Sequence, residues 1–185
     1  CVHLDAAEFQ LLADTQTNVS HCPSSNLKLG SGIAEISRML EQGISVSLGA
    51  DGAACNNRLD MFTEMRTMAL LQKALRGPEA IPASQALRTA TINGARALGL
   101  ENEIGTLEAG KRADVVIVDL STLQAGPYSD PISAVVYSAQ TSDVQTVVID
   151  GRLAMRDRRL LTLDEETILK DADRERRQLL DRAGI

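Results

Sequence analysis

The first hundred residues alternate between short apolar runs and stripes of apolar positions with helical spacing. Residues 17–23, "TNVSHCP", and 44–51, "ISVSLGAD", each predict a short strand, and Pro23 ends the first because proline cannot donate to a ladder. Residues 1–4, "CVHL", are interpreted as the end of an earlier strand. Strands that alternate with helices over short connections are typical of a parallel sheet, so the pattern predicts an α/β fold.

Helical spacing predicts four helices in the same part of the chain, over 6–13, 30–44, 59–76 and 84–98. Ser31 is the predicted cap of the second helix, and Gly43 is its predicted end. The third helix carries a stripe of long apolar side chains that predicts core packing: Met61, Met65, Met68, Leu71 and Leu75. Two or three strands are too few to close a barrel by themselves.

The pattern changes after the fourth predicted helix. Residues 113–120, "ADVVIVDL", predict a strand of β-branched residues, and Asp150 and Gly151 are a hairpin signal between two further strands. The end of the chain has amphipathic spacing and many opposite charges, which predicts a helix that begins near Leu163 or Asp164. We therefore divide the chain into an α/β part, a small β unit and a terminal helix, over 1–104, 105–162 and 163–185.

Composition narrows the functional classes. Of the 185 residues, 44% are hydrophobic and 24% are charged, which is typical of a soluble globular protein. The formal net charge of −6 disfavours nucleic acid as a partner, because phosphate binding needs clustered positive charge. The one basic stretch, 152–159, alternates with acids and apolar residues and is interpreted as a solvated hairpin. No apolar run approaches the roughly 20 residues that cross a bilayer, so no membrane partner is expected.

The cysteines indicate the redox compartment. Cys1, Cys22 and Cys55 show no paired spacing, so we expect free thiols in a reducing compartment, the cytoplasm. No leader sequence is visible, but the chain opens inside a predicted strand and not at a methionine. We therefore expect a preceding N-terminal part of the same protein.

Asp51 is the main candidate for chemistry. It stands where an apolar run gives way to glycine, and the carboxyl ends of parallel strands are where α/β proteins gather functional side chains. A carboxylate there can bind a divalent metal or move protons. The competing interpretation is that Asp51 caps the next helix or forms an Asx turn. His3 and His21 are the only histidines, so the chain cannot supply a complete metal site alone.

Several stretches occur together in a fixed order: "CVHLD", "HCPSSNLKLGSGIA", "SLGADGAACNNRLDMFTEMR", "ATINGARALGL", "IGTLEAGKRADVVIVDL" and "VVIDGR". Together they resemble the C-terminal half of the metal-dependent amidohydrolase superfamily. The resemblance is strongest to the branch that contains methylthioadenosine/S-adenosylhomocysteine deaminases, guanine and 8-oxoguanine deaminases, and s-triazine hydrolases. "LEAGKRADVVIVDL" carries the resemblance to the superfamily, and "HCPSSNLKL" followed by "GADGAACNN" carries the resemblance to the branch.

The resemblance implies a (β/α)8 TIM-like barrel, of which 1–104 would form strands six to eight, joined to a small β-sandwich segment. Asp51 would end strand eight as the last ligand of one divalent metal, zinc in preference to iron, and would accept a proton from the metal-bound water. The other ligands would lie in the N-terminal half of the protein. That half would also place the catalytic histidine directly before Cys1, so His3 is interpreted as structural.

The same resemblance suggests residues around the substrate, and these candidates are His21, Asn26 and Asn56. Each also has a structural interpretation that stays open. His21 can be a buried histidine with satisfied hydrogen bonds, and Asn26 can order the loop that also carries Ser25. Asn56, together with Asn57, can hold the strand-eight loop in place. Cys55 is interpreted as a small thiol and not as a nucleophile, because no base is predicted beside it. Lys111 and Asp114 are expected to have structural roles in the sandwich.

Two classes of function follow. The first is a metal-dependent hydrolytic deaminase of an aminopurine nucleoside or related N-heterocycle, in which metal-bound hydroxide attacks the amidine-like carbon and ammonia leaves. An s-triazine hydrolase, or another C–N or C–Cl hydrolase of the superfamily, is the alternative within this class. The second is a non-catalytic fragment that needs its N-terminal half, because it has open strand edges and one metal ligand. For the complete protein we expect a small-molecule substrate and a homo-oligomer.

Overall fold

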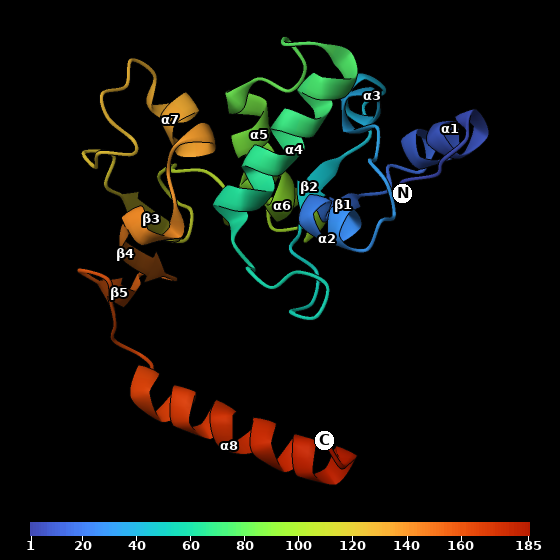
Figure 1. Ribbon diagram of the computed structural model, residues 1–185. Coiled ribbons are helices and arrows are strands. Elements are labelled where there is room, and N and C mark those ends of the chain that lie inside the picture. Colours follow the sequence, from blue (N-terminus) through green and yellow to red (C-terminus); the bar gives the residue numbers. More distant parts are fainter.

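The computed structural model describes residues 1–185, and its first part is built on a short parallel sheet (Figure 1). Strands β1 (Val19–His21) and β2 (Val46–Leu48) pair in parallel, with Val19 opposite Val46 and His21 opposite Leu48. The helices that pack against β2 include α4 (Met61–Arg76), α5 (Ala83–Ala90) and α6 (Ile92–Ala97). The predicted α/β class is therefore confirmed.

Four further helices complete this part: α1 (Ala6–Asp14), α2 (Pro23–Lys28), α3 (Ile36–Glu41) and α7 (Pro131–Tyr137). The start of α1 is specified locally by a capping box, in which Asp5 accepts the N–H groups of Ala7 and Glu8 and the Glu8 carboxylate accepts the N–H of Asp5. Helix α7 comes from much later in the chain, yet it packs against both α4 and α5.

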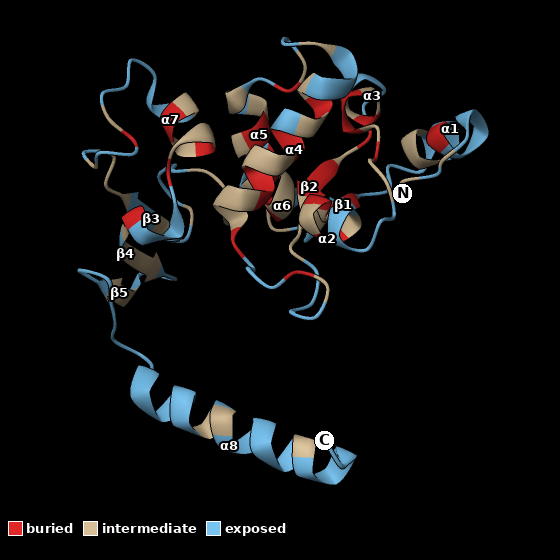
Figure 2. Ribbon diagram, in the orientation of Figure 1, coloured by how far each residue is buried: buried red, intermediate tan, exposed pale blue.

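The hydrophobic core lies between the parallel sheet and its helices, where Figure 2 shows the buried residues concentrated. Met65 and Met68 of α4 are buried together with Ile36 and Met39 of α3. The prediction of core packing is therefore confirmed for Met65 and Met68, a role that suits a flexible and polarizable side chain, whereas Met61 and Leu71 are half-buried outside the core cluster. Leu75, at the end of the stripe, is 49% exposed and lies outside the core.

A buried amide ties α3 to α4. Gln72 stands on the apolar face of α4 and is fully buried. Its Nε2 donates to the carbonyl oxygen of Ala34 at 2.8 Å, and its Oε1 accepts the backbone N–H of Ser37 at 3.0 Å. Because no side chain caps α3, Gln72 satisfies an N–H group in the first turn that would otherwise have no partner.

The second part of the chain is an antiparallel sheet with the strand order β3-β4-β5-β6. The four strands are β3 (Val115–Val118), β4 (Val144–Ile149), β5 (Arg152–Arg156) and β6 (Arg159–Leu160). A short 3-10 helix, η1 (Thr141–Asp143), directly precedes β4. Asp150 and Gly151, with φ of 50° and 74°, form the turn from β4 to β5, which confirms the predicted hairpin. Lys111 and Asp114 have the expected structural contacts: Lys111 Nζ donates to the Glu101 carbonyl, and Asp114 accepts the N–H of Asp150.

Helix α8 (Glu165–Ala183) lies apart from both sheets and has no buried residue (Figure 1). Asp164 caps it by accepting the N–H groups of Glu166 and Thr167, in agreement with the predicted start. Three of its arginines, Arg174, Arg176 and Arg177, pair with acids three or four residues away. No helix of the structure combines the length and the apolar character needed to cross a membrane.

The helix predicted over 30–44 is wrong in its first part. Helix α3 begins only at Ile36, and Ser31 is not its cap. Gly30 and Gly32 have φ values of 68° and 109°, so the backbone is not helical at either glycine. The apolar spacing continues through this stretch, but the glycines permit a different path.

Other expectations are corrected as well. The single helix predicted at the end of the α/β part is broken between α5 and α6, where Thr91 has a non-helical φ of −125° and ψ of −100°. Residues 1–4 form no strand, because no neighbouring strand completes a ladder beside them. Pro23 begins α2, so Ser25 and Asn26 are helical and do not lie in a loop.

We expect Gln72→Leu to lower the free energy of unfolding by roughly 1–3 kcal/mol, because it leaves the buried N–H of Ser37 without a partner and takes one of two donors from the Ala34 carbonyl, which keeps the N–H of Ile36. Urea unfolding followed by circular dichroism measures the change. Gln10→Leu is the matched control, since Gln10 is exposed and bonds only to Asp14, and it should alter stability by less than about 0.5 kcal/mol. Equal effects of the two substitutions would contradict the tethering role of Gln72.

Candidate functional site

The carboxyl ends of β1 and β2 lie at one edge of the sheet because the two strands are parallel. β1 leads directly into α2, and β2 leads through Gly49 into the loop that carries Asp51. The N–H of Gly49 donates to the carbonyl of His21 at 2.9 Å, so the pairing extends to the start of this loop. We call residues 22–28 and 49–57 together the Asp51 edge.

Asp51 is exposed at this edge and is held by two hydrogen bonds. Ser25 Oγ donates to Asp51 Oδ2 at 2.6 Å, and the N–H of Gly52 donates to Oδ1 at 2.8 Å. The φ of Asp51 is 61°, in the left-handed region that side chains other than those of asparagine and aspartate seldom adopt. Aspartate can adopt this turn conformation, and it supplies a carboxylate at a position where glycine would supply no side chain.

The pKa of Asp51 lies below its usual value. The hydrogen bond from Ser25 lowers it most, followed by the bond from the Gly52 N–H, with a further contribution from the Cys55 thiol. The carboxylate is therefore ionised at neutral pH and has lone pairs left for a cation or a proton. Asp51 is not the cap of the next helix, because Asp60 caps α4, and the bond to the adjacent Gly52 is not an Asx turn.

Gly49 allows the two strands to approach closely below Asp51. A Cβ atom at this position would lie 2.7 Å from Ser20 Oγ and 3.0 Å from Cys22 Sγ. These separations are too short for ordinary contacts, so a side chain here would push β1 away from β2. Gly49 is thus needed to leave room for the side chains of Ser20 and Cys22.

His21 lies on the buried face of β1. It is 4% exposed, as is Val19 two residues earlier, whereas Ser20 between them is exposed. Its Nε2 has no hydrogen-bond partner, so it is not the satisfied structural histidine considered from the sequence. Burial lowers the pKa of His21 to about 4. Its role in substrate binding stays a prediction.

The two candidate asparagines occupy different surroundings. Asn26 is half-buried on α2 next to Ser25. Asn56 is buried, donates from Nδ2 to Glu64 Oε1 at 2.8 Å and accepts the N–H of Arg58 at 3.2 Å. These contacts fit the pinning of the loop, and contact of either asparagine with a substrate stays a prediction.

The donor set of the chain fits one ligand of a metal site and not a complete site. No group of three or more histidine, cysteine, aspartate or glutamate side chains is arranged to hold a metal ion. His3 is exposed, and the three cysteines are free, as expected. A metal held by Asp51 would therefore need ligands from outside these residues.

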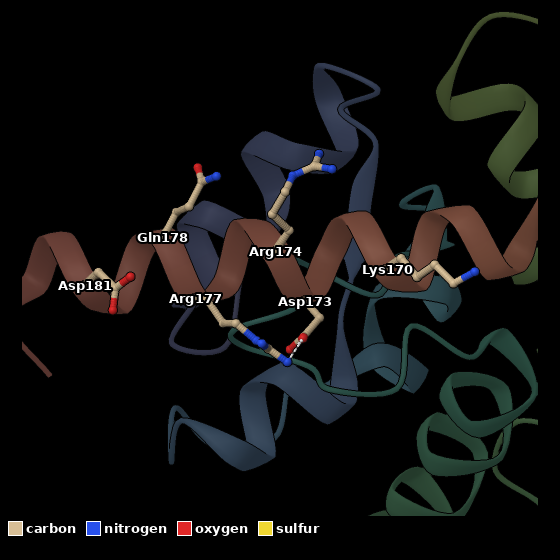
Figure 3. A pocket seen from close by; sticks show the side chains of 6 residues that line it. All are labelled: Lys170, Asp173, Arg174, Arg177, Gln178 and Asp181. Carbon is tan, nitrogen blue, oxygen red and sulfur yellow. Dashed lines mark ion pairs between the residues drawn. The ribbon is translucent and has the colours of Figure 1, made fainter.

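A surface hollow along α8 is unrelated to this edge (Figure 3). Its lining is entirely polar and comes from one helix: Lys170, Asp173, Arg174, Arg177, Gln178 and Asp181. One side of a single exposed helix cannot enclose a ligand, and the ion pair drawn in Figure 3, between Arg177 and Asp173, fits a solvated helix face.

Glu64 is a residue of the site that sequence reasoning missed. It is 1% exposed on α4 and accepts the N–H of Ser24 at 3.1 Å in addition to the bond from Asn56. A signal for it exists in the sequence, since Glu64 stands three residues after Met61 and four before Met68, on the same helical stripe. An acid on an apolar stripe is a candidate for a buried polar contact.

A parallel α/β fold with an ionised acid at the carboxyl edge of its strands is the arrangement in which α/β enzymes place catalytic groups. The chain belongs to the Amidohydrolase family, whose model matches residues 1–154. The resemblance identified from the motifs is therefore confirmed.

Individual relatives agree with this membership. The chain is 51% identical over 182 residues to a 5-methylthioadenosine/S-adenosylhomocysteine deaminase of Desulforudis audaxviator, covering 98% of the chain and 42% of that protein. It is similar, with a TM-score of 0.93 and 40% identity, to the structure of an adenosine deaminase of Xanthomonas campestris with bound zinc, covering 96% of this chain and 40% of that one. A zinc complex of atrazine chlorohydrolase from Arthrobacter aurescens gives a TM-score of 0.86 and 26% identity, covering 92% and 38%. The chain thus spans less than half the length of each.

We expect His21 to make stability depend on pH. In the unfolded chain His21 binds a proton near its ordinary pKa of 6.5, whereas in the folded protein it binds one only near pH 4. The contribution of neutral His21 to the free energy of unfolding is therefore fully present above pH 6.5 and is lost as the pH falls to about 4. The shift corresponds to roughly 3 kcal/mol. Unfolding free energies of the wild type and His21→Phe between pH 4 and 7 measure it, and an unchanged slope in the variant would contradict this role.

Proposed function

We propose that the full-length protein containing this chain is a metal-dependent hydrolytic deaminase of an adenine nucleoside. Membership of the Amidohydrolase family and the 51% identity to a relative named for that activity support the proposal. The structural observation that carries it is Asp51, an exposed carboxylate at the shared edge of two parallel strands, oriented by Ser25. The finer substrate proposal is a 5′-thioether of adenosine, as in the name of that relative.

In the proposed reaction, water adds to the ring carbon that bears the exocyclic amine, and the bond from that carbon to nitrogen breaks to release ammonia. Asp51 accepts the proton that the water loses and returns it to the departing nitrogen, since one carboxyl group can act first as base and then as acid. Ser25 holds one oxygen of Asp51 in a fixed direction through its 2.6 Å hydrogen bond. The low pKa of Asp51 keeps it ready to accept the proton at neutral pH.

Zinc is the proposed metal, because two structurally similar proteins contain it. When bound, a divalent metal lowers the pKa of its water toward neutrality. Asp51 would supply one oxygen ligand from this chain. The remaining ligands would come from an N-terminal part of the protein, a proposal supported by the chain spanning 42% of the length of its deaminase relative.

A triazine hydrolase is the second candidate, favoured by the TM-score of 0.86 to atrazine chlorohydrolase. The identity of 26% to that protein, against 51% and 40% to the two adenosine-type deaminases, favours the nucleoside. The isolated chain is expected to be inactive, since it offers one metal ligand. A homo-oligomer in the cytoplasm stays a prediction.

Asp51→Asn in the full-length protein is expected to lower kcat by about 10²–10⁴-fold, because an amide cannot accept the proton. Ammonia release measures turnover, and circular dichroism should show unchanged folding. Asp119→Asn is the matched control: Asp119 is a half-buried aspartate that, like Asp51, accepts a serine hydroxyl, here that of Ser121 in the β unit, and its loss should leave kcat unchanged. Near-normal turnover of Asp51→Asn would contradict the assigned role.

A substrate panel tests the reaction class. We expect the highest kcat/KM for methylthioadenosine and S-adenosylhomocysteine, measured by ammonia release, with lower values for guanine, 8-oxoguanine and pterins. Atrazine, assayed by chloride release, distinguishes the second candidate. Hydrolysis of the triazine without deamination of any nucleoside would replace the proposal with that candidate.

A further inference from the structure

Glu64 is a buried carboxyl group that the proposed reaction does not use. It is 1% exposed on α4, and no lysine, arginine or histidine forms an ion pair with it. Burying an acid is unfavourable unless hydrogen bonds replace those of water. Its two oxygens accept one donor each: Oε2 the N–H of Ser24 at 3.1 Å, and Oε1 the Nδ2 of Asn56 at 2.8 Å.

These two donors belong to the two segments that meet at Asp51. Ser24 directly precedes Ser25, whose hydroxyl donates to Asp51. Asn56 belongs to the loop that begins at Asp51 and returns to α4. Glu64 therefore fixes, from one point on α4, both the segment that carries the donor and the segment that carries the acceptor of the Ser25–Asp51 hydrogen bond.

Helix α2 depends on this contact for its start. Its N-cap, Cys22, makes no side-chain capping bond, so the N–H groups of the first turn lack a local partner. Glu64 supplies that partner to Ser24 from another helix. At the exposed side, Lys28 Nζ donates to the Ala54 carbonyl at 2.7 Å and to Asn57 Oδ1 at 2.6 Å, so α2 and the loop are joined on two sides.

We propose that Glu64 is a positioning residue that aligns Asp51 for proton transfer by tethering α2 and the 51–57 loop to α4. The proposal rests on the function proposed for Asp51 in its catalytic part. Its structural part, the tethering itself, holds independently of any reaction. Glu64 touches no substrate atom and acts through Ser25 and Asp51.

A reversal of donor and acceptor tests this in the full-length, zinc-loaded protein. In Glu64→Gln the introduced amide oxygen still accepts the N–H of Ser24, but its nitrogen faces Nδ2 of Asn56, so two donors oppose each other. Rotating the Asn56 amide would take its oxygen away from the N–H of Arg58. In the double variant Glu64→Gln/Asn56→Asp, the introduced carboxylate accepts from the introduced amide and still accepts from Arg58, so every bond is restored.

We expect Glu64→Gln to lower kcat about 10- to 100-fold, as residues that orient an active group do, with KM changed by less than about threefold because substrate contacts remain. The double variant should regain most of the lost kcat. Amide hydrogen exchange of residues 22–30 and 51–58 gives a readout without substrate: it should accelerate in Glu64→Gln and return toward the wild-type rate in the double variant.

Gln72→Leu is the control for simple destabilisation, because it removes buried hydrogen bonds on the same helix that do not reach Asp51. It should keep kcat at a temperature where it is folded, although its unfolding midpoint decreases. Equal losses of kcat in Gln72→Leu and Glu64→Gln, a wild-type kcat and exchange rate in Glu64→Gln, or no recovery in the double variant would each overturn the proposal. Absence of deamination in the wild type would refute the proposed function alone, since hydrogen exchange would still decide the tethering.

Discussion

Parallel pairing of β1 with β2 is the constraint on which the Asp51 edge depends. Because both strands run in the same direction, with His21 opposite Leu48, the connections after them leave at the same edge. Ser25 and Asp51 therefore meet although they are 26 residues apart. An antiparallel pair would place the two connections at opposite ends of the strands, so the contact between Ser25 and Asp51 depends on the parallel direction of the strands.

Polar residues on the apolar face of α4 turn this general arrangement into a specific one. Met65 and Met68 bring the helices and the sheet together, but apolar contacts are non-directional and tolerate small shifts. Hydrogen bonds in a buried environment are directional and unfavourable to break. Gln72 holds α3 in this way, and Glu64 holds the two segments that carry Ser25 and Asp51.

Local sequence signals predicted most helices and strands, but they failed to predict the boundaries that depend on tertiary contacts. The turn at Asp150 and Gly151 and the start of α8 after Asp164 were predictable, because turn and cap chemistry acts within a few residues. The break at Thr91 was not, since helical spacing continues across it and only the packing of α5 and α6 on β2 separates them. α2 was missed for a related reason, because Pro23 is equally compatible with the end of a strand and the start of a helix.

The α/β class, the resemblance to the amidohydrolases and the position of Asp51 after an apolar strand could all be predicted from the residues alone, because periodicity, turn residues and short motifs are local properties. The contacts of the side chains could not, because they come from the folded arrangement of the helices and strands. Asn56 bonds to Glu64 eight residues away, and Ser24 bonds to the same residue at a separation of 40. Such contacts depend on where the helices lie on the sheet, and that placement results from burial of the whole core, which no short stretch of sequence encodes.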